Sequence, residues 1–138
     1  MPAKDIYHDS VRNALVKDGW MITHDPLRIS WGGRDMYIDL GAERLIAAER
    51  GEQKIAVEVK SFVGDSVVAD LEKAIGQFVL YRAVLAERDP DRKLYLAVPK
   101  DILQNVFAEP LGELLMKNHL AQVMGFDPQT DEIIKWIP

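Results

Sequence analysis

Apolar residues recur every three or four positions in two stretches of the chain, and this spacing predicts helices. The first stretch covers residues 5–18, with Asp5 as a candidate N-cap and Gly19 just past the C-terminal end. The second is longer and covers residues 65–87. The turn-forming segment Asp89-Pro90-Asp91 is predicted to end it.

Shorter apolar runs lie between turn-forming residues, and these runs predict strands. The runs at 45–50 and 54–62 flank Gly51-Glu52, which predicts a hairpin, and Asp25-Pro26 is predicted to end a strand at 20–24. The other predicted elements are a strand at 94–98, short helices at 101–107 and 111–116, and a closing strand pair at 120–127 and 132–137. This order predicts a mixed α/β fold, and the length of 138 residues suits a single domain.

The hairpin also predicts a register. If Gly51-Glu52 forms a two-residue turn, Arg50 pairs with Gln53 and Glu58 lies opposite Leu45. Lys60 then lies opposite Glu43, on the same side of the sheet. A slip of one residue would turn Glu43 to the other side, so this pairing depends on the turn.

Composition narrows the classes of function. The chain has no cysteine, which excludes a disulfide scaffold, a cysteine nucleophile and thiolate metal sites. Its 17 basic and 22 acidic residues are interspersed and give a net charge of −5, so any contact with DNA must be local, metal-assisted or shared with a partner. No membrane-length apolar run or signal peptide is present, and we expect a cytoplasmic protein without membrane contact. His8, His24 and His119 are predicted to be structural or solvated.

Glu58 and Lys60 form the most informative pair in the chain. Side chains alternate along a strand, so both lie on one face while Val57 and Val59 point to the other. A carboxylate beside a lysine suits phosphodiester hydrolysis, in which the carboxylate holds Mg²⁺ or Mn²⁺ and the lysine orients the attacking water. The alternative is an ordinary ion pair on an exposed strand.

A metal of this kind needs further oxygen ligands, and two upstream carboxylates are candidates. Asp39 precedes Gly41, and Glu43 follows it. Asp39 could instead cap backbone amides in a turn, and Glu43 could pair with Arg44 or Lys60 without a metal. The sequence leaves open which of the two carboxylates joins Glu58.

Asp39, the Glu58-x-Lys60 motif and the long helix that follows resemble the PD-(D/E)XK nuclease superfamily, although Ile38 stands where the motif has proline. Gln77 and Tyr81 match the Gln-x-x-x-Tyr element of some branches and share one helical face. The resemblance implies a restriction-endonuclease-like mixed sheet flanked by helices, with Asp39, Glu58, Lys60 and Gln77 as catalytic residues. Gln77 and Tyr81 could instead simply pack the helix on the sheet.

A closer resemblance, to the XisH family, covers nearly the whole chain. It rests on the segments Ala3–Asp9, Asp39–Glu43, Ile55–Phe62, Gly76–Tyr81, Leu94–Pro99 and Trp136–Pro138. These fdxN-element excision controlling factors of cyanobacteria control excision of a DNA element during heterocyst development. The resemblance implies action with a site-specific recombinase and a companion factor, XisI.

Two hypotheses follow. In the first, the chain is an accessory factor of DNA recombination with a metal-dependent endonuclease-like site. In the second, it is a catalytically inactive interaction module that docks on a recombinase or on the companion factor. A homo-oligomer is also expected, since the endonuclease-like fold often works in pairs.

Overall fold

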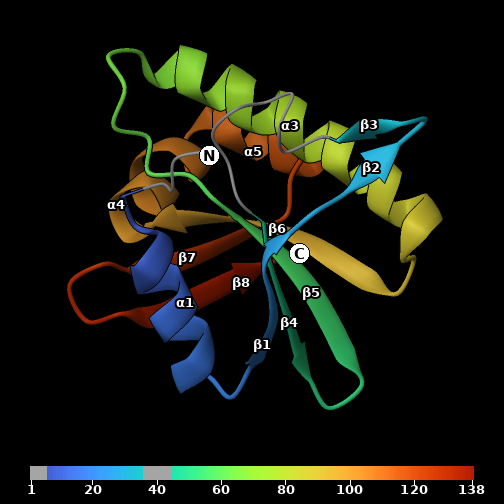
Figure 1. Ribbon diagram of the computed structural model, residues 1–138. Coiled ribbons are helices and arrows are strands. Elements are labelled where there is room, and N and C mark those ends of the chain that lie inside the picture. The colour runs from blue at the N-terminus through green and yellow to red at the C-terminus, as the bar shows by residue number, and fades with distance from the viewer. Residues whose placement is uncertain (1–5, 36–44) are drawn as a thin grey trace.

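The computed structural model describes residues 6–35 and 45–138, and its centre is a six-stranded mixed sheet (Figure 1). The strands follow the order β1-β4-β5-β6-β7-β8, in which β5, β6 and β7 are parallel and the other neighbours are antiparallel. Their bounds are β1 Met21–Leu27, β4 Leu45–Arg50, β5 Gln53–Val59, β6 Arg92–Pro99, β7 Val123–Asp127 and β8 Glu132–Ile137. The predicted mixed α/β sheet flanked by helices is therefore confirmed.

Helices cover both faces of this sheet (Figure 1). One face packs against α3 (Val67–Arg88), the π-helix η1 (Leu103–Phe107) and α5 (Pro110–Lys117), and the other packs against α1 (His8–Lys17). The single turn α4 (Lys100–Ile102) leads into η1. Each face has its own apolar cluster, so the sheet separates two cores.

The hairpin of β4 and β5 has the predicted register. Arg50 pairs with Gln53, and Leu45 pairs with Glu58. The second strand ends at Val59, earlier than predicted, although the backbone N–H of Lys60 still donates to the carbonyl of Ala97 at 2.9 Å. Asp39 and Glu43 lie outside the described residues.

Helix α3 connects β5 to the parallel strand β6. Ser66 caps its start, where the Ser66 hydroxyl accepts a hydrogen bond from the Ala69 amide at 3.1 Å. The observed helix agrees with the predicted one to within two residues at each end. This crossover places the whole inner face of α3 over the middle of the sheet.

The prediction that Asp25-Pro26 ends the first strand is wrong. Strand β1 continues to Leu27, and the Asp25–Pro26 peptide bond is cis. A proline is tolerated because β1 lies at the edge of the sheet and its register against β4 is irregular on both sides of His24. The chain can therefore pass proline without leaving the sheet.

The smaller elements complete the structure. The predicted helix at 101–107 divides into α4 and η1, and α5 packs so closely on η1 that a Cβ at Gly112 would collide with the Val106 carbonyl oxygen. The short hairpin of β2 (Ser30–Trp31) and β3 (Arg34–Asp35) lies beside the C-terminal end of α3, where Arg88 contacts the Trp31 ring. Among the described residues, no helix is long and apolar enough to cross a membrane.

Candidate functional site

Glu58 lies at the sheet–α3 interface, near the carboxyl end of β5. By strand alternation it shares a face with Ala56, which belongs to the apolar cluster under α3. The residue has an exposed fraction of 0%. The alternative of an ion pair on an exposed strand is therefore wrong, because this carboxylate is withdrawn from solvent.

Lys60 brings a positive charge to the same place. It is 8% exposed, and its Nζ lies 3.8 Å from Glu58 Oε1, which is within ion-pair range but longer than a hydrogen bond. Removing two charges from water costs several kcal/mol per ion, by order of magnitude, and close hydrogen-bonded geometry is what offsets that cost. The two groups therefore form a buried charge pair in which their attraction, without a short hydrogen bond between them, opposes the cost of burial.

Gln77 and Tyr81 project from α3 toward the sheet. They are 5% and 1% exposed, so the structure places them on one buried helical face, as their spacing predicts. Within the described part of the chain, no donor reaches Gln77 Oε1. A buried amide oxygen without a donor is costly to keep and is typical of a group retained for another purpose.

The metal ligands predicted upstream are not among the described residues. Over residues 6–35 and 45–138, no three histidine, aspartate or glutamate side chains lie close enough to hold a metal ion. Glu58 fits Mg²⁺ or Mn²⁺ as one hard oxygen ligand. A complete set at this point would need Asp39 or Glu43.

A hollow of about 120 Å³ leads from Lys60 to the surface, and sequence reasoning missed it. Its walls include Phe62, Gly64 and Lys73 of α3. Phe62 has a positive φ of 57°, and its ring packs edge-on against Phe107, which holds the loop in place. Two lysines, Lys60 and Lys73, therefore line the hollow, together with Asp70. In the sequence, the only signal for this hollow is the position of Lys73 near the start of the predicted helix, shortly after Lys60.

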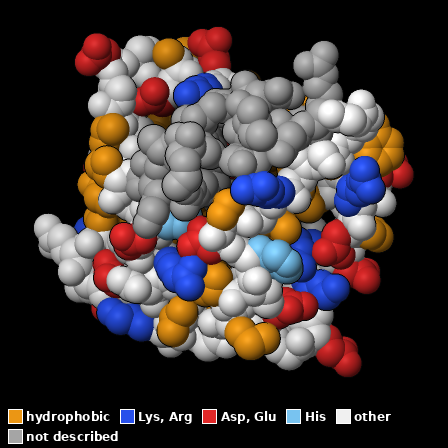
Figure 2. Space-filling model, viewed as in Figure 1, with side chains coloured by type: hydrophobic (Ala, Val, Ile, Leu, Met, Phe, Trp, Pro, Cys, Tyr) orange, Lys and Arg blue, Asp and Glu red, His pale blue; other side chains and the backbone are white. Residues whose placement is uncertain are grey.

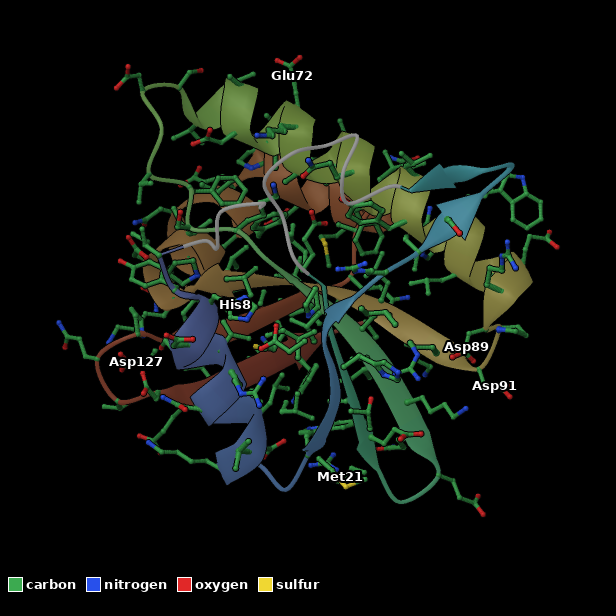
Figure 3. The ribbon with its side chains drawn as sticks, viewed as in Figure 1. His8, Met21, Glu72, Asp89, Asp91 and Asp127 are labelled. Atoms are coloured by element: carbon green, nitrogen blue, oxygen red, sulfur yellow. The ribbon has the colours of Figure 1, made fainter. Side chains whose placement is uncertain are left out.

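A second polar cluster lies on the other face of the sheet, under α1. His8 is 2% exposed, and its Nε2 lies 2.8 Å from Asp25 Oδ1, while Arg12 donates to Asp25 Oδ2 (Figure 3 labels His8). Burial opposes ionisation of Asp25, but the hydrogen bonds and charges of His8 and Arg12 outweigh it and lower the pKa of this carboxyl. The mutual bonding agrees with the prediction that His8 is structural.

The fold and the site together define a class of protein: a mixed α/β domain with a buried glutamate–lysine pair near the end of a central strand. The family model described as XisH protein matches residues 1–134. The chain belongs to the XisH family, as its sequence resemblance predicted.

Two solved structures support this assignment. One is an XisH family protein from Nostoc punctiforme, 41% identical, with a TM-score of 0.88 over 97% of this chain and 100% of that chain. The other is an fdxN element excision controlling factor protein from Anabaena variabilis, 43% identical, with a TM-score of 0.87 over 97% of this chain and 99% of that chain. None of the curated proteins matches the chain.

Proposed function

We propose that this protein takes part in the control of DNA excision and that Glu58 and Lys60 form an endonuclease-like site. The structural observation that carries the proposal is the buried pair itself, 3.8 Å apart at the sheet–α3 interface, with Lys60 also lining a surface hollow. The role in excision control is supported by the relative from Anabaena variabilis, which is described as an fdxN element excision controlling factor. Family membership over residues 1–134 supports the same role.

Each residue of the proposed site would have a distinct role. Glu58, with Asp39 or Glu43, would hold Mg²⁺ or Mn²⁺. The bound ion would activate water and neutralise charge on the phosphate. Lys60 would orient the attacking water, and Lys73 would meet a phosphate oxygen at the opening of the hollow. Gln77 would support the site with its buried amide.

Any contact with DNA would be local. On the face of the molecule viewed in Figure 2, basic side chains are interspersed with acidic ones. A net charge of −5 also disfavours binding through broad neutralisation of phosphates. We therefore expect recognition to depend on the site itself and on partners, namely a site-specific recombinase and an XisI-like companion factor.

A second candidate function is a catalytically inactive module that docks on the recombinase, on the companion factor or on a second copy of the chain. The complete burial of Glu58 favours it, because a carboxylate with 0% exposure is less accessible to a metal than one in an open cleft. The acidic balance of the chain also favours contacts with protein. The two candidates differ in whether Glu58 binds a cation.

Calorimetric titration with Mn²⁺ separates them. We expect saturable binding to the full chain that is lost in Glu58→Gln, which keeps the size of the side chain and removes its charge. The matched control is Glu72→Gln, which removes a carboxylate from the outer face of α3 (Figure 3) and is expected to bind as the parent does. Lys60→Met should still bind Mn²⁺ but lose nicking of plasmid DNA, because it removes the group that orients water.

Each result has a direct consequence. Loss of binding in Glu58→Gln alone would establish the metal site and make the nicking assay decisive. Equal binding in the parent, Glu58→Gln and Glu72→Gln would contradict the role of Glu58. No binding in any of them would reject the endonuclease-like site and leave the docking module.

A further inference from the structure

A second and larger cavity opens at the other end of the sheet. Its volume is about 630 Å³, within the range of small-molecule sites, and it lies where the β4–β5 hairpin turns and β6 begins. Gln53 and Ile55 of β5 line it. Glu58 lies roughly 10–16 Å further along the same strand and points to the opposite face from Ile55. This cavity is therefore separate from the candidate metal site.

Three aromatic rings meet at the cavity. Trp136 lies edge-on to Tyr95, with ring centroids 4.8 Å apart, and it lies 5.9 Å from the ring of Trp20. Trp20 and Tyr95 are 6% and 8% exposed, whereas Trp136 is only half-buried. Trp136 is thus a fixed ring with accessible surface, which is the arrangement on which a planar base stacks.

Charged groups of both signs surround these rings. Arg50 lies over the Trp20 ring at 4.4 Å and is held there by Asp18, so it helps to fix the aromatic wall. Lys93 is exposed and shares a strand face with Tyr95, and none of the ion pairs between described residues includes it. Glu52 and Asp91 also line the cavity and supply acceptors. An ammonium group is available for a phosphate, and the carboxylates are available for the amino groups of a base.

We propose that this cavity binds a nucleotide, with the base against Trp136 and the phosphate at Lys93. The stacking ring and the nearby hydrogen-bond acceptors match the base of that ligand, and an ammonium group without an ion partner among the described residues matches its phosphate. A free mononucleotide and one nucleotide within a single strand both carry this base and phosphate. The proposal goes beyond excision control and does not depend on a metal at Glu58.

Tryptophan fluorescence tests the proposal with deoxyadenosine monophosphate as the probe. All variants are made in a Trp31→Phe protein. Trp31 lies in the β2–β3 hairpin, and its replacement leaves Trp20 and Trp136 as the fluorescent reporters. We expect saturable quenching in this background. Lys93→Gln should weaken binding about tenfold through loss of a charge-assisted contact. The matched control, Lys135→Gln, removes an equal charge from β8 outside the cavity and should change nothing.

A second arm identifies the source of the nucleotide. A single-stranded dodecamer that binds far more tightly than the mononucleotide would assign the site to a strand, and comparable affinities would assign it to the free nucleotide. Because Lys93 is exposed, its replacement should not unfold the chain. Glu58→Gln, made in the Trp31→Phe protein, should bind the nucleotide with the same affinity as Trp31→Phe alone. Absence of saturable quenching with both probes, or equal binding in Lys93→Gln and Lys135→Gln, would overturn the proposal.

Discussion

Helices α1 and α3 cover opposite faces of one sheet, but the buried polar groups under them are arranged differently. Under α1, His8 and Arg12 both bond to the Asp25 carboxylate, with the His8–Asp25 contact at 2.8 Å. Under α3, Glu58 and Lys60 are 3.8 Å apart, and Gln77 Oε1 has no donor among the described residues. Since buried polar groups in proteins are usually satisfied, the cluster under α1 stabilises the fold, whereas Gln77 Oε1 is buried at a cost.

The difference concerns how much each group of polar side chains contributes to stability. A tight network offsets its own desolvation and holds α1 on the edge strand. A buried pair held at 3.8 Å, without a short hydrogen bond between its two groups, contributes less to stability. The two faces should therefore respond in opposite directions when a polar group is removed.

The largest effect is expected from Asp25→Ala, on the face under α1. It would leave buried His8 and half-buried Arg12 without their shared acceptor, so the free energy of unfolding should fall by about 2–3 kcal/mol. Denaturant unfolding measures this. Asp91→Ala, at the loop between α3 and β6 (Figure 3), is the control and should change stability by less than about 0.5 kcal/mol. Equal effects in the two variants would remove the distinction between the faces.

A smaller effect of opposite sign is expected under α3. Gln77→Met keeps the shape of the side chain and removes the amide oxygen that lacks a donor, so the free energy of unfolding should rise by about 1 kcal/mol. The same denaturant series measures it, with Gln104→Met on the exposed side of η1 as the control. A clear loss of stability in Gln77→Met would mean that the amide is part of the structural framework.

The smallest effect concerns pH. The folded-state pKa of Asp25 is lowered, so its contribution to stability is present above the ordinary value near 3.8 and is lost as the pH falls through the lower folded-state value. In the range below about pH 4, the parent should lose stability more steeply than Asp25→Asn. Thermal unfolding of both proteins between pH 6 and pH 2.5 checks this. The other acidic residues are common to both, so the difference between the two curves reports on residue 25. Parallel curves would contradict the role given to His8 and Arg12.

Local signals were enough to predict much of the fold. The turn at Gly51-Glu52 determined the pairing of Leu45 with Glu58, because a two-residue hairpin leaves only one register. The apolar periodicity of residues 65–87 predicted α3, and with it the common face of Gln77 and Tyr81. For the candidate site, these signals placed Glu58 and Lys60 on one strand end.

Features that depend on distant contacts were not predictable. Strand β1 passes Pro26 because it pairs with β4 at the edge of the sheet, and pairing of this kind is invisible in the local pattern. His8 and Asp25 are 17 positions apart and meet only when α1 packs on β1. The hollow beside Lys60 needs both the turn at Phe62 and the first turns of α3. The roles of Asp39 and Glu43 stay predictions.

Strand β5 also has a consequence for the order of folding. It pairs with β4 through a tight turn, which forms within microseconds as an elementary event, and with β6 only across the 22 residues of α3. Non-local pairing is the slower kind, because the loop must close before its contacts form. We therefore expect the hairpin to form early and the β5–β6 pair to form late. The Glu58 carboxylate would become buried only when β5 pairs with β6. In a folding intermediate without that pair, Glu58 would still be solvated on the β4–β5 hairpin.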